Sequence, residues 1–204
     1  MNNEIEFWYE FGSNYSYLSA MRIESLTQCN GLAVRWMPFL LGPIFKSFGW
    51  ETSPFVLQRR KGAYMWEDMV RQCRKYDVPW RRPSEFPRLA LLPMRLAILG
   101  RNEPWIGAFT RKVMLMNFAE DRDINSPDAM CDVLNELGLD AERLIVEAQA
   151  EENKARLRAQ TEAAERRGIF GAPTFFVRGQ MYWGNDRLED AIGDALSMHG
   201  ISIR

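Results

Sequence analysis

Residues 4–18 read EIEFWYEFGSNYSYL, and this stretch decides the fold at the front of the chain. The run Glu4–Glu10 alternates at first and is rich in aromatic residues, which predicts a β-strand. Apolar residues near helical spacing over Ser16–Cys29 predict a helix that Gly31 can end. A second strand is expected at Ala33–Met37. The two strands should be parallel neighbours, because crossovers of this kind are right-handed.

The far end of the chain shows a similar mixture of strand and helix signals. Thr174–Val177 predicts a short strand, and Met181–Trp183 predicts its hairpin partner. Between them, Arg178-Gly179-Gln180 predicts a tight connection of three residues. Asp186–Met198 then predicts a closing helix, because three aliphatic residues fall on one of its faces.

The middle of the chain is different. Gly, Pro, Ser and Trp over Gly42–Pro54 predict an irregular loop. The helices predicted after it are Phe55–Tyr76, Ala90–Gly100, Pro104–Ala119, Ser126–Leu137 and Ala141–Arg167. We therefore expect an α/β protein with a thioredoxin-like fold, formed by residues 1–45 and 168–204, and an inserted all-α domain over residues 46–167.

Composition and charge restrict the possible functions. The chain has 204 residues, and 47% of them are hydrophobic, which is enough for a packed globular core. Its 26 basic and 27 acidic residues nearly cancel, so no overall field recruits nucleic acid or an anionic membrane. The start lacks a basic segment followed by an apolar run, and no apolar stretch approaches about 18 residues. We expect a cytoplasmic protein.

The cysteines and the histidine argue against several kinds of site. Cys29, Cys73 and Cys131 are far apart and form no CxxC motif, which disfavours a disulfide framework and a structural zinc site. We expect small buried apolar residues at these positions and no metal site. His199 is the only histidine, in the tail of a predicted helix. We interpret it as a polar helix-end residue, although a Ser-His or Cys-His nucleophile would need it.

Ser13 lies where the first strand passes into the first helix. Unpaired N–H groups and the positive end of the helix dipole favour an anion there, and a hydroxyl can donate to a thiolate. A serine stands where a redox thioredoxin would have its first cysteine, so the site can hold another molecule's thiol without disulfide exchange. The alternative is that Ser13 or Asn14 only caps the helix, and the two roles are compatible.

The pair Ala172-Pro173 comes after a helix and before a strand. Proline lacks a backbone donor and is awkward in a sheet. With strands and helices arranged as predicted around it, we expect a cis bond. Such a bond would expose the backbone groups of Ala172 to an extended peptide ligand, as in strand addition.

Asn185 and Asp186 join the last strand to the last helix. Asp186 is a good helix cap in one interpretation. In the other, its carboxylate faces a ligand and pairs with an α-ammonium group, while Asn185 holds the neighbouring α-carboxylate.

Lys61 and Tyr64 are three residues apart on a predicted helix and therefore share a face. A solvated basic surface is one interpretation, because Arg59 and Arg60 precede Lys61. If the helix leans over Ser13, Lys61 can supply positive charge to a ligand carboxylate.

Four runs together resemble a known family. The runs are Phe7–Leu18, Lys61–Trp66, Gly168–Phe176 and Trp183–Leu188. They are similar to those of the 2-hydroxychromene-2-carboxylate isomerases and the related kappa-class glutathione transferases, within the DsbA-like thioredoxin superfamily. The similarity spans essentially the whole chain. It implies a glutathione-dependent enzyme that is commonly a homodimer, with glutathione as a cofactor and not a consumed reagent.

The resemblance also implies roles for individual residues. Ser13 would be catalytic and stabilise the glutathione thiolate, the backbone at Ala172-Pro173 would pair with the cysteinyl part, and Asn185 with Asp186 would take the γ-glutamyl end. The full set expected to bind glutathione is Ser13, Lys61, Tyr64, Ala172, Pro173, Asn185 and Asp186. The chain departs from the family at Asn14, usually proline, at Glu10, usually aspartate, and at Phe55, near where some members have a polar ligand residue.

Three functions remain open at this stage. The first is a glutathione-dependent isomerase of an aromatic-degradation intermediate, by thiolate addition to an unsaturated carbonyl substrate, bond rotation and elimination. The second is a kappa-like glutathione transferase that releases a conjugate. The third is a catalytically silent module that binds a peptide or a protein.

Overall fold

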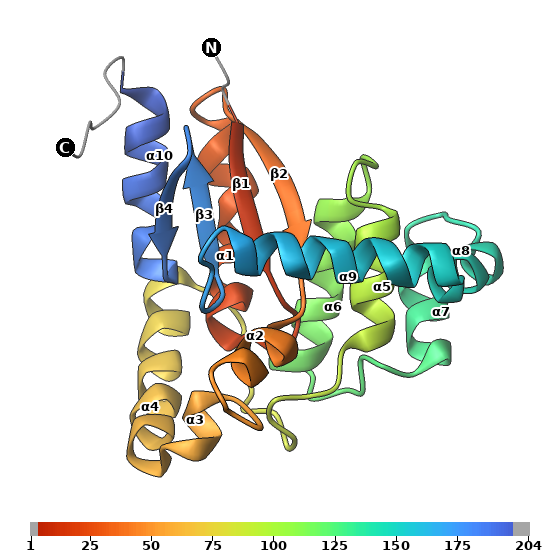
Figure 1. Cartoon of the computed structure of the whole chain (residues 1–204), viewed down its shortest axis with the longest axis horizontal. Helices are drawn as coiled ribbons and strands as arrows, with labels where there is room; N and C mark the ends of the chain where they lie inside the picture. Colours follow the sequence, from red (N-terminus) through yellow and green to blue (C-terminus); the bar gives the residue numbers. More distant parts are fainter. Residues whose placement is uncertain (1–3, 198–204) are drawn as a thin grey trace.

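The computed structural model describes residues 4–197, which contain one four-stranded sheet. The strands are β1 (Glu4–Tyr9), β2 (Ala33–Pro38), β3 (Thr174–Val177) and β4 (Gln180–Trp183), in the order β2-β1-β3-β4. β1 and β2 are parallel, whereas β3 is antiparallel to both of its neighbours. The parallel pairing predicted at the front of the chain is confirmed, and the two ends of the chain meet where β1 pairs with β3 (Figure 1).

The hairpin between β3 and β4 is shorter than predicted. Its connection has two residues, Arg178 and Gly179, and Gln180 already pairs with Val177. Both connecting residues have positive φ, 50° and 83°. Positive φ at both central positions is the backbone form that matches the twist of the flanking strands, so a two-residue turn suffices.

Eleven helical segments surround the sheet in the described part of the chain. They are α1 (Asn14–Gln28), α2 (Leu41–Ser47), α3 (Pro54–Leu57), α4 (Arg59–Tyr76), α5 (Leu91–Leu99), α6 (Ile106–Phe118), α7 (Pro127–Glu136), α8 (Ala141–Gln149), α9 (Glu151–Arg166), the 3₁₀ turn η1 (Asn185–Arg187) and α10 (Leu188–Leu196). Figure 1 shows α9 crossing in front of the sheet, with α5 to α8 gathered beyond β2 and with α3 and α4 below.

The predictions for three segments in the middle of the chain need correction. The segment Gly42–Pro54 is not wholly irregular, because α2 occupies its first half. The helix predicted over Ala141–Arg167 is two helices, since Ala150 adopts extended backbone (φ −62°, ψ 146°) and interrupts the hydrogen-bond ladder. The end of the predicted closing helix, Met198, lies outside the described residues, as does His199.

The helix predicted over Phe55–Tyr76 is also divided. Gln58 (φ −105°, ψ 83°) breaks it, and α3 folds back against α4. Gly62 is the point of closest approach, because a Cβ there would overlap the carbonyl oxygen of Phe55. The short α3 thus packs closely against the N-terminal turn of the long α4.

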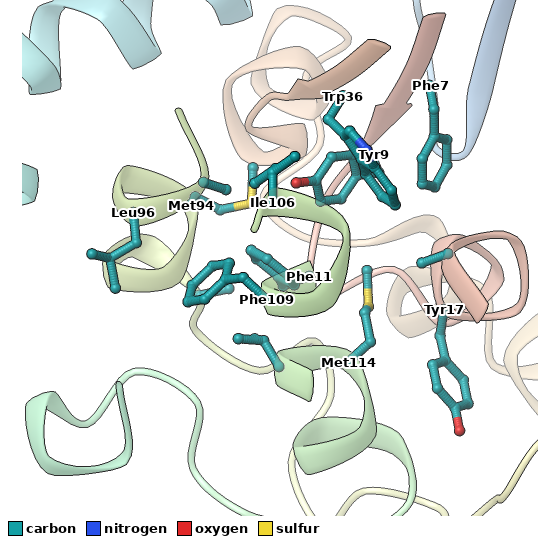
Figure 2. Packing of buried hydrophobic residues seen from close by; sticks show 14 of the residues in the cluster. Phe7, Tyr9, Phe11, Tyr17, Trp36, Met94, Leu96, Ile106, Phe109 and Met114 are labelled. Atoms are coloured by element: carbon teal, nitrogen blue, oxygen red, sulfur yellow. The ribbon is translucent and has the colours of Figure 1, made fainter. Parts of the chain in front are cut away.

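The side chains on the two faces of β1 belong to two different hydrophobic clusters. Ile5, Phe7 and Tyr9 belong to the larger cluster, which continues into α5 and α6 (Figure 2). Tyr9 contacts Phe11 edge-on, with ring centroids 5.6 Å apart, and Phe11 contacts Phe109 of α6 in the same way. Trp8 points to the other face and packs in the smaller cluster beneath α9. The predicted insert shares one core with the sheet, and the domain boundaries stay a prediction.

The remaining sequence predictions concern cysteines, metals and membranes. Cys73 is buried as expected, but Cys29 is exposed, and all three cysteines are free. Residues 4–197 contain no cluster of three or more His, Cys, Asp or Glu side chains that could hold a metal ion. Across the same residues, every helix is too short or too polar to span a bilayer.

Candidate functional site

A cavity of about 840 Å³ opens beside the carboxyl end of β1. Its lining residues come from segments 10–15, 40–45, 51–55, 86–91, 170–173 and 183–187, and from Lys61, Asp68 and Gln72 of α4. The loops after β1, β2, β4 and α9 thus meet α4 at one place. Six of the seven residues predicted to bind glutathione line this cavity, and Tyr64 is the one that does not.

Ser13 connects two walls of the cavity. It is the N-cap of α1, and its Oγ accepts a hydrogen bond from the backbone N–H of Ser16 at 3.2 Å. The same hydroxyl donates to the carbonyl oxygen of Ala172 at 3.0 Å. The capping interpretation is therefore correct, and Ser13 also faces the cavity. The first N–H groups of α1 have no partner inside the helix, which leaves positive potential beside this hydroxyl.

The loop opposite Ser13 contains the predicted cis bond, Ala172-Pro173. The Pro173 carbonyl accepts a hydrogen bond from the N–H of Gly184 at 2.9 Å, which ties this loop to the end of β4. A second cis bond, Phe86-Pro87, lies in another wall of the same cavity. This second cis bond was not predicted from the sequence. Cis is a minority state for Xaa-Pro bonds, and the local pattern gives no reason for it.

Asn185 is held in place from inside the protein. It is buried, and its Oδ1 accepts hydrogen bonds from Ser19 Oγ at 3.0 Å and from Arg22 Nη1 at 3.3 Å. Arg22 lies 3.5 Å above the ring of Tyr76 and forms an ion pair with Glu189. The side chain of Asn185 therefore has a fixed orientation at the cavity wall.

Asp186 behaves differently from its neighbour. Its side chain is 73% exposed and lies 3.2 Å from the guanidinium of Arg187. Neither η1 nor α10 has a side-chain cap, so the alternative in which Asp186 caps the last helix is wrong. The carboxylate is available at the cavity mouth.

Lys61 and Tyr64, predicted to share a helix face, lie in different surroundings in the structure. Lys61 lines the cavity, and its Nζ lies 5.6 Å from the centre of the Phe55 ring. Within the described residues it forms no ion pair, so its charge can meet a ligand anion. Tyr64 is 61% exposed and lies beneath Arg71 on the outer surface of α4.

Three lining residues that the sequence analysis overlooked form a polar group on the α1 and α4 side. Tyr15 Oη donates to Asp68 Oδ2 at 2.8 Å, and Gln72 Nε2 donates to Asp68 Oδ1 at 3.2 Å. Burial and the neighbouring carboxylate raise the pKa of Tyr15 well above its usual range. The hydroxyl stays protonated and holds α1 against α4. The helical spacing of Asp68 and Gln72 was visible in the sequence, but their partner on another helix was not.

Glu10 is the acidic residue nearest to Ser13 along the chain, and it lines the cavity as well. Its Oε2 accepts a hydrogen bond from the N–H of Gly12 at 3.0 Å. Burial raises the pKa of the Glu10 carboxyl to about 7, and the bond from Gly12 opposes this only in part. In the sequence alone, Glu10 stands out only as a departure from the family pattern.

Much of the remaining cavity wall is apolar, although Glu51, Thr52, Ser53 and Arg88 also line it. The apolar part includes Leu40, Leu41, Pro43, Phe45, Phe55, Phe86, Leu89 and Leu91. At the rim, the rings of Phe170 and Trp183 meet with centroids 4.7 Å apart. The cavity thus combines one polar end, around Ser13, with an apolar region large enough for an aromatic molecule.

The fold and the site define the class of this protein. The sheet, the helix that begins at Ser13 and the cis-proline loop are those of a thioredoxin-like protein, yet no cysteine lines the cavity in the described residues. A family model described as a DSBA-like thioredoxin domain matches residues 4–194. The chain belongs to this DsbA-like thioredoxin family.

Comparison with curated proteins identifies the relatives more closely. The chain is 30% identical to a 2-hydroxychromene-2-carboxylate isomerase of Pseudomonas putida, over 93% of this chain and 94% of that protein. It is 27% identical to glutathione S-transferase kappa 1 of Homo sapiens, over 91% and 87% of the two chains. A solved 2-hydroxychromene-2-carboxylate isomerase structure superimposes with a TM-score of 0.84 at 26% identity, over 93% and 94% of the chains. The resemblance inferred from the four sequence runs is confirmed, and these relatives are enzymes.

Proposed function

We propose that this protein is a glutathione-dependent isomerase of an aromatic-degradation intermediate such as 2-hydroxychromene-2-carboxylate. The observation that carries the proposal is the position of Ser13, whose hydroxyl lies at the start of α1 and contacts the Ala172 carbonyl within one cavity. The curated relatives support the proposal, because they include isomerases of that name and kappa glutathione transferases.

The residues that line the cavity fit glutathione by their chemistry. The tripeptide has a thiol, an extended backbone, an α-ammonium group and two carboxylates. Ser13 offers a hydroxyl donor for the sulfur, and Ala172 offers backbone groups for the peptide. The exposed carboxylate of Asp186 suits the α-ammonium group, and Lys61 and the amide of Asn185 suit carboxylates.

Ser13 has one hydroxyl proton, and in this structure it is directed at Ala172. Turning that O–H toward the cavity would give a sulfur anion a donor and would free the Ala172 carbonyl for a ligand N–H. One rotation of the Ser13 hydroxyl would thus serve both the sulfur and the peptide backbone of the ligand. The positive end of α1 favours the anion further, since unpaired N–H groups there lower thiol pKa values.

When bound, glutathione would supply a thiolate that adds to the unsaturated carbonyl substrate, permits rotation about the former double bond and is eliminated again. The apolar walls would hold the aromatic part of that substrate and exclude water. They include Leu40, Leu41 and Phe45 from the segment after β2, and Phe86 and Leu89 from the segment before α5. We also propose a homodimer in the cytoplasm, which light scattering on the purified protein and cell fractionation would test.

The test is to mix the purified protein with 2-hydroxychromene-2-carboxylate and glutathione, and to follow both the substrate geometry and the free glutathione. An isomerase converts the substrate while total free glutathione stays constant. Omitting glutathione should abolish conversion, and Ser13→Ala should reduce it. Failure of wild-type protein to convert this and related unsaturated carbonyl substrates would refute the isomerase proposal.

A kappa-like glutathione transferase is the second candidate, favoured by the match to human kappa 1 over most of both chains. It would use the same residues around Ser13 but release a conjugate. Loss of free glutathione in proportion to product, with an electrophilic aryl halide as acceptor, would identify it. A silent binding module would show neither reaction, and its binding would survive Ser13→Ala.

A further inference from the structure

The carboxyl group of Glu10 is an unusual feature of the cavity wall. Glu10 is the first residue after β1, and the N–H of Ser13 donates to its carbonyl oxygen at 3.1 Å. This turn brings the side chains of Glu10 and Ser13 into the same cavity. Glu10 is only partly exposed, and its Oε2 is held by the N–H of Gly12. The other oxygen, Oε1, has no hydrogen-bond donor among residues 4–197.

The charged groups around the cavity do not neutralise Glu10. Arg88 presents its backbone carbonyl toward Gly12, whereas its guanidinium forms an ion pair with Asp121 at 2.6 Å. The remaining charged residues lining the cavity are Glu51 in the loop before α3, Lys61 and Asp68 on α4, and Asp186 and Arg187 in η1. Within the part of the chain that the structure describes, Glu10 forms no ion pair with any of them.

A partly buried carboxyl without a cationic partner is costly when ionised, because the single N–H of Gly12 replaces only part of the water it has lost. Burial accordingly raises its pKa to about 7. An apolar residue would fill the same space without this cost. A carboxyl that titrates near neutral pH is instead suited to receive and return a proton, since a general base is most effective when its pKa lies near the working pH.

We propose that Glu10 accepts the thiol proton of the glutathione bound at Ser13. The S–H bond breaks, its electron pair stays on sulfur, and the proton forms an O–H bond with the Glu10 carboxylate. The proton remains in the site and returns to sulfur when the thiol is restored. The inference rests on the proposed function, because it needs glutathione in this cavity.

The experiment counts protons while the thiolate forms. Glutathione binding is measured by calorimetry at about pH 8 in buffers of different ionisation enthalpy, and the ultraviolet thiolate band is recorded in parallel. At that pH Glu10 is mostly ionised, while a free thiol, with a pKa of about 8.5, is mostly protonated. S-Methylglutathione, which has no thiol, corrects for protons that the amino and carboxyl groups exchange.

Wild-type protein should form the thiolate and release close to no proton to the buffer. The new thiolate disfavours a second negative charge beside it, so the Glu10 carboxyl keeps the proton even at pH 8. Glu10→Gln should release about one proton for each thiolate formed, because no carboxylate remains to hold it. Glu10→Asp restores the carboxyl and should behave like wild type. Glu51→Gln removes a carboxylate from another wall of the cavity and should leave the proton count unchanged.

Two results would overturn the inference alone. One is release of about one proton per thiolate by wild-type protein, and the other is an unchanged proton count in Glu10→Gln. A wild-type protein that binds glutathione without any thiolate band would exclude both this role for Glu10 and the thiolate addition of the proposed function. No saturable binding of glutathione at all would refute the proposed function together with the inference.

Discussion

Gly62 should be the glycine of α4 that cannot be replaced without moving the cavity wall. A Cβ at this position would overlap the carbonyl oxygen of Phe55 and lie 3.2 Å from its carbonyl carbon. Backbone atoms cannot swing aside as the end of a side chain can, so α3 must shift away from α4. Phe55 lines the cavity, and a shift of α3 would therefore carry part of the wall with it.

The size of the effect follows from two opposing contributions. Replacing glycine by alanine inside a helix stabilises it by about 0.8–1 kcal/mol. Forcing an extra carbon into packed surroundings costs about 1–3 kcal/mol. Gly62→Ala should therefore destabilise the protein by up to about 2 kcal/mol, the difference of these two ranges, and should not stabilise it.

Gly193 provides the matched control. It lies in α10 and is exposed, and a Cβ there would meet nothing within 4 Å. Gly193→Ala should therefore stabilise the protein by up to about 1 kcal/mol. Urea unfolding, followed by both circular dichroism and tryptophan fluorescence, compares the two variants. Equal stabilisation by both substitutions would refute the argument that α3 packs closely on α4.

Three further predictions concern the cavity. The folded-state pKa of Glu10 is raised from 4.5 to about 7, so its contribution to stability is present below pH 4.5 and is lost as the pH rises toward 7. Glu10→Gln should lack this decline in stability when urea unfolding is measured at several pH values. Arg22→Met removes a hydrogen-bond donor to Asn185, and calorimetry should find glutathione bound about 5- to 20-fold more weakly, with an unchanged thiol pKa. Unchanged affinity would contradict the role of Arg22 in anchoring Asn185. Lys61→Gln should weaken glutathione binding about 5- to 10-fold in low salt, whereas Tyr64→Phe should have no effect, because Tyr64 lies outside the cavity. Equal losses of affinity would contradict the placement of Lys61 inside the cavity and Tyr64 outside it.

The parts of the fold that could be predicted were those indicated by short stretches of the sequence. The strand over Glu4–Tyr9, the helix after Ser13 and the strand over Ala33–Pro38 each carry their own periodicity, and their pairing follows from chain handedness. The cis bond at Ala172-Pro173 followed from its position between predicted elements. These features depend on few contacts between distant parts of the chain.

The features that were missed depend on contacts between distant segments. Gln58 interrupts a continuous helical pattern where α3 packs closely on α4, and no local signal marks that residue. Ala150, a strong helix former, adopts extended backbone, so its own propensity pointed the wrong way. Spacing placed Tyr64 beside Lys61, but only the packing of α4 decides which of the two faces the cavity.

The chemical environment of individual side chains could not be predicted from the sequence either. Glu10 was visible as a glutamate at an unusual position, but its burial depends on walls formed by residues far away in the sequence, including Arg88. Asn185 was predicted as a ligand residue, whereas its anchor Arg22 was not, because the two are 163 residues apart.

The most direct test of the account is a titration of glutathione into wild-type protein and Ser13→Ala, with the ultraviolet thiolate band followed as a function of pH. We predict a saturable band in wild-type protein with a thiol pKa below that of free glutathione, and loss of that depression in Ser13→Ala. A band of equal size and equal pKa in the two proteins would contradict the role assigned to Ser13. Absence of binding to wild-type protein would contradict the proposal that glutathione occupies this cavity.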